Sequence, residues 1–444
     1  MTPMTQGIPG KGLMRGMLLG ILLSSLLCAR VEDEPDFSAF DTIHPWVVSP
    51  EIIAKGYAYG RVRESNFEES KVPRYQLPEL MRFLDGRPVE TPADWAKRRI
   101  ELLRLFRQNV FGTSPPRPDT LTFSVVDRHS GSLDGRATFK RVAIRFHAGG
   151  EPFVFHVTLY VPNQRERPAP VFLLIRHKAH TPAQQAVEDD GEFWPVNYAI
   201  KRGYAMMVMD AAAEIDPDEP RADFGIRAFY RRQVAEGQTF TWRMLAAWAW
   251  GAARAMDYIE TDPDLDAHNV AVVGHSRGGK AALWAGAQDE RFRLVIPNNA
   301  GDGATCLVRR RLGNTIEVMT ARNPHWFVDQ YATYAQREAS APFDQHMLIA
   351  LVAPRGYHAG DGSEDLWHDP LGSWLALREA SKAWTLTGSA RSMEDKPMPE
   401  VNELVRNGAI AYHLRTGEHA LRLIDWKLYF DHADAFFGAN PPGR

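Results

Sequence analysis

Residues 272–280, which read Val-Val-Gly-His-Ser-Arg-Gly-Gly-Lys, decide how the rest of the sequence is interpreted. They contain the pattern G-x-S-x-G, with Ser276 at its centre. A β-prone run at 269–273 leads into the pattern, and a helix-prone run at 280–287 follows it. A turn this tight has no room for side chains beside the serine, so glycine on both flanks lets it close. The stretch therefore predicts a strand, a sharp turn that presents Ser276, and a helix whose N-terminus lies beneath a developing oxyanion.

The rest of the chain alternates between β-prone and helix-prone runs. We expect strands at 121–126, 140–146, 153–161, 170–175, 204–209, 294–296, 357–360 and 409–414, and helices at 91–111, 195–201, 241–259 and 426–437. Strands that alternate with helices favour a mostly parallel sheet covered on both faces. Together with the turn at Ser276, this order predicts an α/β protein of the α/β-hydrolase fold, with a mostly parallel central sheet sandwiched between helices.

Length and charge narrow the class of protein. The chain has 444 residues, of which 44% are hydrophobic, and a formal net charge of −3. It is long enough to bury a large core, and it lacks the basic excess that nucleic-acid binding requires. Residues 30–90 are polar and rich in Pro, Gly and charged residues, so we expect an extended N-terminal arm there. Residues 91–444 are predicted to form one catalytic domain.

Residues 1–29 have the features of a signal peptide. Two basic residues precede the apolar run 16–27, which is too short to span a bilayer comfortably. We therefore expect an exported protein, periplasmic or extracellular, without a membrane span. A lipoprotein anchor at Cys28 is the less favoured alternative, because the leucine before it fits such a signal poorly.

A serine nucleophile needs a histidine base, and the histidine needs a carboxylate to orient it. In an α/β-hydrolase these follow in the order Ser, Asp or Glu, His, with the histidine in the loop after the last strand. His419 lies in such a loop and is assigned as the base. His413 lies within the last predicted strand, where we expect it to pack, and His432 on the final helix is a weaker alternative.

The position of the acid stays open at this level. The loop at 360–370 follows a predicted strand and contains four carboxylates, Asp361, Glu364, Asp365 and Asp369. A second position, just after the strand at 294–296, is occupied by the uncharged Asn298 and Asn299. Asp302 is near that position but lies in a glycine-flanked turn.

Several motifs occur in an order known from one enzyme family. They lie at 274–281, 288–292, 324–327, 344–348, 353–355, 363–370 (Ser-Glu-Asp-Leu-Trp-His-Asp-Pro) and 412–419 (Tyr-His-Leu-Arg-x-Gly-x-His). Over 90–440 the chain resembles the bacterial branch of carbohydrate esterase family 15, the 4-O-methyl-glucuronoyl methylesterases or glucuronoyl esterases. The resemblance implies a serine carboxylester hydrolase of lignocellulose degradation, which cleaves the ester between a glucuronic acid branch of xylan and a lignin alcohol. It also implies no metal and no organic cofactor.

The resemblance further implies a role for each matching residue. Ser276 corresponds to the nucleophile and His419 to the base. Arg277 corresponds to the residue that stabilises the oxyanion through its backbone N–H and its guanidinium. Lys280 corresponds to a lysine that bonds sugar hydroxyls, and Trp367 to a tryptophan that lines the sugar site.

Two positions depart from the family pattern. Many members carry the catalytic glutamate where this chain has Asn299, whereas some bacterial members carry an acid after the later strand, which matches Asp365. We therefore assign Asp365 as the acid, with Glu364 as its substitute. Where the family often has Gly-Glu-Thr with a glutamate that contacts the sugar, this chain has Asn314.

Alternative functions remain open because of these departures. One is another carbohydrate esterase, such as an acetyl xylan esterase, and another is a catalytically silent carbohydrate-binding relative. A metal site is not expected, because no carboxylate or cysteine completes a ligand spacing with His177 and His180, which instead line the site or pack behind it. We expect glucuronoxylan or a lignin–carbohydrate ester as the binding partner, no nucleic acid, and a monomer.

Overall fold

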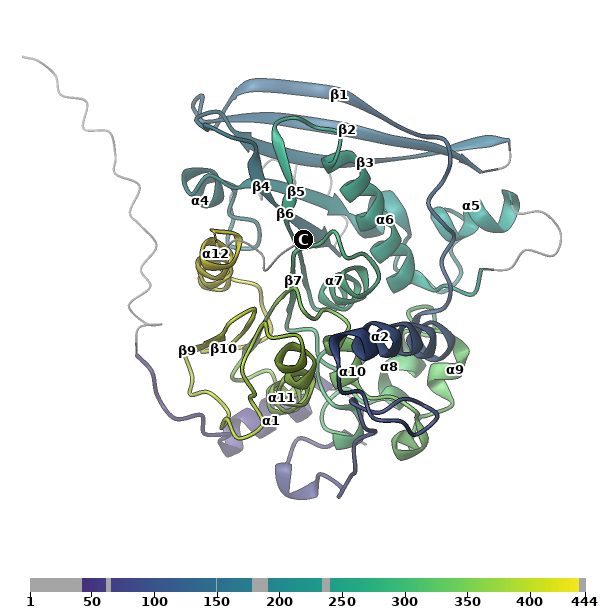
Figure 1. Cartoon of the computed structure of the whole chain (residues 1–444), viewed down its shortest axis with the longest axis vertical. Coiled ribbons are helices and arrows are strands. Elements are labelled where there is room, and N and C mark those ends of the chain that lie inside the picture. Colours follow the sequence, from purple (N-terminus) through teal and green to yellow (C-terminus); the bar gives the residue numbers. More distant parts are fainter. Residues whose placement is uncertain (1–41, 61–64, 149, 178–190, 234–239, 439–444) are drawn as a thin grey trace, which may run out of the picture. The chain divides into compact units, whose positions relative to one another are not determined.

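The structure is a computed structural model that describes residues 42–60, 65–148, 150–177, 191–233 and 240–438 (Figure 1). These residues belong to one compact unit, 40–444. The predicted signal peptide at 1–29, with Cys28, lies outside the described residues, as does His180.

In the described part of the chain, ten strands form one sheet in the order β1-β2-β3-β5-β4-β6-β7-β8-β10-β9. Their bounds are Leu121–Ser132 (β1), Ala137–Ala148 (β2), Glu151–Pro162 (β3), Ala169–Arg176 (β4), Ala205–Asp210 (β5), Leu265–His275 (β6), Leu294–Asn298 (β7), Gly356–Gly362 (β8), Glu403–Asn407 (β9) and Ile410–Arg415 (β10). The strands from β5 to β10 along this order are parallel, whereas β1 to β3 at one edge and β9 at the other pair antiparallel. The predicted mostly parallel sheet is confirmed in its centre.

Helices cover both faces of this sheet (Figure 1). Helices α6 (Met244–Ile259) and α7 (Arg277–Gln288) lie on one face, and α4 (Val196–Lys201) and α12 (Leu423–Gly438) lie on the other. Successive side chains of a strand point to opposite faces. In β4, accordingly, Leu173 and Ile175 pack in the core that contains α6 and α7, whereas Phe172 and Leu174 pack in the core that contains α12. Two apolar cores thus hold the central strands in a fixed position.

Helix α2 (Pro92–Phe106) begins where the sequence predicts. The Thr91 side chain accepts a hydrogen bond from the Asp94 backbone N–H at 3.1 Å, which satisfies one of the free donors at the helix start. The helix continues as a π-helical turn at Arg107–Phe111 (η3) before the proline-rich segment ends it. π-helical turns often occur at functional sites.

Six helices of the described residues lie where the sequence analysis expects none, and α1 and α11 are the longest of them. Helix α1 (Pro50–Gly60) lies within the segment for which we predict an extended arm. Helix α11 (Pro370–Leu386) follows Asp369, whose side chain accepts from the Gly372 backbone N–H. The remaining helices are α5 (Ile226–Gln233), α8 (Ile316–Arg322), α9 (Asp329–Ala332) and α10 (Gln345–Ala350).

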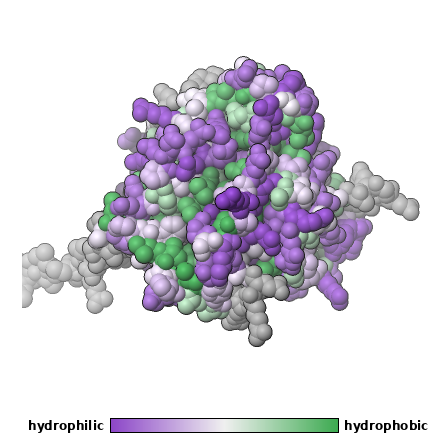
Figure 2. Space-filling view, turned by 90° about the horizontal axis from the view of Figure 1, so that it is seen from below, coloured by the Kyte–Doolittle hydropathy of each residue, from purple (hydrophilic) through white to green (hydrophobic). Residues whose placement is uncertain are grey.

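Hydrophilic residues cover most of the face that Figure 2 shows, with smaller hydrophobic areas between them. Of the helices in the described residues, none combines the length and the apolar character needed to cross a membrane. The aromatic side chains of Trp194, Phe229 and Tyr230 are buried in the two cores.

Candidate active site

Ser276 occupies a sharp turn between strand β6 and helix α7. Its backbone has φ +55° and ψ −124°, a conformation that non-glycine residues rarely adopt and that occurs where a side chain must be presented. A Cβ atom on Gly274 would lie 2.1 Å from the Gly278 carbonyl oxygen, and one on Gly278 would lie 2.6 Å from the Ile175 carbonyl oxygen. Both glycines are therefore required for the turn to close, as the sequence predicts.

Ser276 opens into a pocket of about 860 Å³ beside the carboxyl ends of the parallel strands. All the residues predicted for the site line this pocket: Ser276, Arg277, Lys280, Glu364, Asp365, Trp367 and His419. The loops after β6, β8 and β10 supply the serine, the carboxylates and the histidine, which is where ligands bind in open α/β sheets.

His419 and Asp365 form a hydrogen-bonded pair. The His419 Nδ1 atom lies 2.7 Å from the Asp365 Oδ2 atom. Because Nδ1 faces the carboxylate, Nε2 is the nitrogen that remains for proton exchange with a nucleophile. Burial acts to raise the pKa of Asp365, but the charges and hydrogen bonds of His368 and His419 outweigh it and hold that pKa well below its usual value. Asp365 is therefore an ionised carboxylate across the neutral range.

Asp365 has two further partners that the sequence analysis did not assign. His368 Nδ1 lies 2.9 Å from Asp365 Oδ1, and the Asn299 amide donates to Asp365 Oδ2 at 2.9 Å. The His368 ring also stacks on the His419 ring, with centroids 4.1 Å apart. Burial lowers the pKa of His368 to about 4, so this ring is neutral in the neutral pH range. The motif at 363–370 signals His368, whereas the contact of Asn299 with the acid depends on tertiary packing.

Glu364, the substitute acid, points toward another partner. The Lys55 ammonium of helix α1 pairs with Glu364 Oε2 at 2.5 Å, and the Glu364 side chain is 27% exposed. A carboxylate that is solvated and already paired does not orient His419. The geometry therefore favours Asp365 over Glu364 as the acid.

Arg277 is the first residue of helix α7 and directly follows Ser276. Its backbone N–H therefore has no acceptor within the helix. Its guanidinium pairs with Asp218 and lies 4.9 Å from the centre of the Trp326 ring. Asp218 also accepts from Trp326 Nε1 at 2.8 Å and lies 2.7 Å from His325 Nε2. Burial opposes the ionisation of Asp218, but these hydrogen bonds and the charge of Arg277 lower its pKa below the usual value. Asp218, which the sequence analysis missed, fixes the guanidinium beside the pocket.

Lys280 is 1% exposed and lies one helical turn beyond Ser276. Its ammonium donates to the Ala300 carbonyl at 2.5 Å and also to the Asp302 carbonyl. Burial lowers the pKa of Lys280 and raises the pKa of the neighbouring Asp302 carboxyl. Lys280 thus connects α7 to the 300–302 turn at the pocket wall. Asp302 contacts this lysine, and its position does not favour it as the acid that orients His419.

Trp367 forms an aromatic wall of the pocket and is 6% exposed. Its ring stacks on Phe67 with centroids 6.1 Å apart, and Tyr59 of helix α1 meets its edge at 5.8 Å. Asn314, which stands where the family often has glutamate, lines the same pocket and donates its backbone N–H to the Trp367 carbonyl at 3.0 Å. The N-terminal segment therefore supplies part of the pocket through α1, a contribution that its composition did not indicate.

The two alternative histidines, His413 and His432, lie away from the pocket. His413 is 1% exposed, and its Nε2 atom lies 2.8 Å from Asp425 Oδ1. His432 is buried, and neither of its ring nitrogens has a hydrogen-bond partner in the described part of the structure. His177, after strand β4, lies with its ring 5.8 Å from that of His275, the residue before the nucleophile. His275 in turn hydrogen-bonds the Asn298 side chain at 2.7 Å, so both rings pack behind the turn.

One group in the described residues is compact enough to offer three ligand atoms to a metal ion: Asp365, His368 and His419, whose ligand atoms lie within 4.8 Å of one another. The Nδ1 atoms of both rings already lie at hydrogen-bond distance from the two carboxylate oxygens. This arrangement orients His419 without an ion.

The fold and the pocket define a class of protein. A serine on a strained turn, with a histidine–carboxylate pair in the same pocket of an α/β-hydrolase sheet, is the arrangement of a serine ester hydrolase. The family described as "Glucuronyl esterase, fungi" matches residues 144–388. The chain is also 35% identical to carbohydrate esterase MZ0003 from an unknown prokaryotic organism, over 88% of this chain and 94% of that protein.

Solved structures agree with these matches. The glucuronoyl esterase from Solibacter usitatus has a TM-score of 0.77 and 35% identity, covering 83% of this chain and 100% of that one. A promiscuous CE15 esterase from a marine bacterial metagenome has a TM-score of 0.76 and 35% identity, covering 83% and 99%. The chain belongs to the glucuronoyl esterase family, carbohydrate esterase family 15, in its bacterial branch. It is a carboxylic ester hydrolase.

Proposed function

We propose that this protein hydrolyses glucuronoyl esters, in which the glucuronic acid of xylan is esterified to a lignin-type alcohol. The observation that carries the proposal is the 2.7 Å contact between His419 Nδ1 and Asp365 Oδ2 in the pocket that Ser276 also lines. Membership of the glucuronoyl esterase family supports the uronate as the acyl group.

The proposed reaction proceeds through an acyl-enzyme on Ser276. His419 Nε2 takes the Ser276 hydroxyl proton while Oγ attacks the ester carbonyl carbon, and Asp365 stabilises the resulting imidazolium. The Arg277 backbone N–H and guanidinium stabilise the oxyanion of the tetrahedral intermediate. The alcohol leaves with the proton from His419. Water, deprotonated by His419, then releases the uronic acid and restores Ser276.

The substrate carbonyl carries no net charge before cleavage, so the pocket has to recognise a neutral ester rather than a carboxylate. Lys280 and Asn314 offer polar contacts to sugar hydroxyls, and Trp367 offers an aromatic surface to the sugar ring. We propose these three residues as the sugar-binding side of the pocket.

The test is hydrolysis of benzyl glucuronate beside an acetylated sugar. We expect wild type to cleave the uronate ester, Ser276→Ala and Asp365→Asn to lose that activity, and Glu364→Gln to keep most of it. Glu364→Gln is the matched control, because it removes a carboxylate one residue away that pairs with Lys55. A loss of uronate cleavage in Glu364→Gln with retention in Asp365→Asn would reverse the assignment of the acid.

A second candidate function is hydrolysis of other carbohydrate esters, such as acetyl esters. Asn314 in the pocket, where the family often has a glutamate that contacts the sugar, favours a wider substrate range. One solved relative is itself described as promiscuous. Acetyl release without uronate cleavage in the same assay would establish this candidate in place of the first.

We also propose that residues 1–29 act as an export signal, on the basis of their two basic residues and apolar run. Export would bring the enzyme to a polymer that does not enter the cell. N-terminal sequencing of protein recovered from the medium or the periplasm tests this, and a start after Ala29 is the expected result.

A further inference from the structure

A second pocket of about 510 Å³ differs from the first in the residues that line it. Four arginines line it, together with the aromatic residues Phe240 and Trp242: Arg107, Arg227, Arg231 and Arg243. Trp326 lines the first pocket, and Val328 lines the second. The Cα atoms of two residues so close in sequence lie at most about 7 Å apart. The linings of the two pockets therefore approach each other along the segment 326–328.

Two of the four arginines have carboxylate partners. Arg227 makes two hydrogen bonds to the buried Asp216, at 2.8 and 2.9 Å. Arg243 pairs with Asp329 at 2.7 Å, although its Nε atom is buried without a hydrogen-bond partner in the described structure. These pairs hold the two guanidinium groups in place at the pocket wall.

The other two arginines have no carboxylate partner among the described residues. Arg107 donates only to the Gln288 side-chain oxygen, through two long contacts of 3.4 Å. Arg231 donates to the Ala222 carbonyl at 2.9 Å. Because a guanidinium stays charged at any ordinary pH, the described residues that line the pocket carry a positive charge that they do not balance among themselves.

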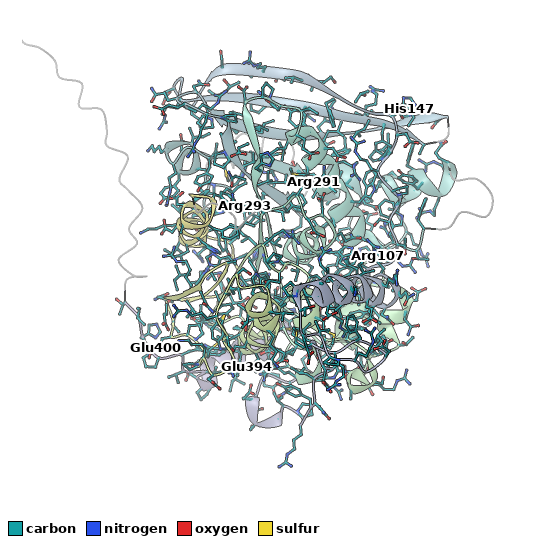
Figure 3. All side chains as sticks on the ribbon, viewed as in Figure 1. Arg107, His147, Arg291, Arg293, Glu394 and Glu400 are labelled. Atoms are coloured by element: carbon teal, nitrogen blue, oxygen red, sulfur yellow. The ribbon has the colours of Figure 1, made fainter. Side chains whose placement is uncertain are left out.

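Arg107 shows this imbalance most clearly. It begins the π-helical turn η3, is labelled in Figure 3, and is half-buried with its guanidinium against Gln288 at the end of α7. Burial, together with the charge of Arg99, lowers the pKa of Arg107. Taking a charge out of water without a partner is unfavourable, so a bound anion would relieve it.

We propose that this pocket binds the ionised carboxylate of an unesterified uronic acid on the same polysaccharide chain that presents an ester to the first pocket. The inference rests on the proposed function. A planar guanidinium matches a carboxylate with two parallel hydrogen bonds, and the aromatic side chains offer a surface to the sugar ring. The first pocket takes the neutral ester, whereas the second takes neighbouring acids, including those that earlier turnovers have released.

The experiment compares three substrates with one pair of variants. The substrates are benzyl glucuronate, an esterified glucuronoxylan oligosaccharide with additional free uronates, and the same oligosaccharide with those free carboxylates reduced to alcohols. The variant is Arg107→Gln combined with Arg231→Gln. The matched control is Arg128→Gln combined with Arg145→Gln, which removes the same charge from exposed positions on β1 and β2.

We expect the double variant to raise KM about tenfold for the oligosaccharide with free uronates and to leave the other two substrates unchanged. The control variant should match wild type on all three. Added salt should raise KM of wild type for the acidic oligosaccharide toward the value of the double variant, because screening weakens the attraction. An unchanged KM in the double variant, or an equal rise for the reduced oligosaccharide, would overturn the proposal.

The test of the second pocket can be separated from the test of the proposed esterase function. If wild type does not cleave benzyl glucuronate, direct binding of the unesterified oligosaccharide to Ser276→Ala, with and without the two arginine changes, still tests the second pocket. Binding that weakens about tenfold in the double variant supports it, and binding that stays unchanged overturns it.

Discussion

Two of the histidine–carboxylate clusters in the described part of the chain have similar hydrogen bonds but differ in their access to solvent. In the open cluster, His419 lies 2.7 Å from Asp365, and His368 binds the other oxygen. In the closed cluster, His413 lies 2.8 Å from Asp425, and His358 Nε2 lies 3.0 Å from the other nitrogen of the His413 ring. Each pairs a carboxylate with one histidine and places a second histidine beside it.

The difference lies in what the cluster faces. The side chain of His419 is 18% exposed and lines the active-site pocket, whereas that of His413 is 1% exposed beneath helix α12. The three side chains of the closed cluster, His358, His413 and Asp425, are all buried. A histidine–carboxylate pair therefore becomes a candidate catalytic pair only where the fold also gives it a pocket and a nucleophile.

The two clusters are connected through Arg415. Its Nε donates to Asp425 at 3.0 Å, and its Nη2 donates to the carbonyls of Glu418 at 2.8 Å and Ala420 at 2.5 Å, on either side of His419. The buried cluster thus holds the loop that carries the histidine of the open one. This contrast leads to the predictions below.

The largest effect is expected when each carboxylate is neutralised in turn. Asp365→Asn should lower kcat/KM by about 10³- to 10⁴-fold, because His419 loses the group that orients it and stabilises its charge. Asp425→Asn leaves the buried Arg415 without its ion pair and should reduce the free energy of unfolding by about 3–5 kcal/mol. Benzyl glucuronate kinetics and urea unfolding measure the two effects. If Asp425→Asn stays as stable as wild type but loses as much activity as Asp365→Asn, the distinction between a catalytic open cluster and a structural closed cluster is wrong.

His432, whose ring lies 5.1 Å from that of His358 in the closed cluster, should make the fold sensitive to acid. Burial lowers the pKa of His432 to about 3, so the unfolded chain binds a proton that the folded protein rejects between about pH 6.5 and pH 3. The stability that the neutral ring contributes is complete above about pH 6.5 and is lost as the pH falls toward 3. At about pH 4 the loss is on the order of 3 kcal/mol relative to pH 7.

His432→Met removes this proton uptake while keeping an apolar side chain of similar length. The difference in unfolding free energy between about pH 7 and pH 4 should shrink by about 3 kcal/mol in this variant. His268→Gln, at an exposed position, is the control and should leave that difference unchanged. If both variants lose stability with acid as steeply as wild type, His432 does not contribute to acid sensitivity.

Arg415→Lys should separate the structural support of the loop that carries His419 from the binding of substrate. Lysine keeps the positive charge for Asp425 but lacks the planar fork that reaches two carbonyls at once. The loop around His419 should loosen, and kcat should fall about 30-fold with KM little changed, because a small misplacement of a catalytic group is costly. Arg406→Lys on strand β9, which is exposed, is the matched control. An increase in KM with unchanged kcat would indicate that Arg415 acts on substrate binding instead.

The sequence predicts the parts of the site that depend on local spacing. The glycines around Ser276 are two residues away on each side, and the motifs at 363–370 and 412–419 place Asp365 and His419 after the correct strands. It does not predict helix α1, whose residues Lys55 and Tyr59 line the pocket, because the surrounding composition resembles that of a loop. Contacts between distant segments, such as that of Asn299 with Asp365, are set by the order of strands in the sheet.

The smallest expected effect concerns Asn299, which connects the acid to the neighbouring strand. Its amide donates to Asp365 Oδ2 at 2.9 Å from the end of β7, the position where many family members have a glutamate. In Asp365→Asn, adding Asn299→Glu should return a carboxylate to the neighbourhood of His419 and recover kcat/KM about tenfold. In the otherwise wild-type protein, the same change places two carboxylates in one buried site, which raises the pKa of one of them and should lower activity.

Asn299→Gln in the Asp365→Asn background is the control, since it lengthens the side chain without adding a charge. Recovery in the glutamate variant alone would show that either strand end can hold the acid that orients His419. Equal recovery in both would mean that side-chain length, and not charge, had been limiting. No recovery in either would mean that the β7 position in this chain is too far from His419 to replace Asp365. The open cluster would then depend on a single carboxylate, just as the closed cluster depends on Asp425.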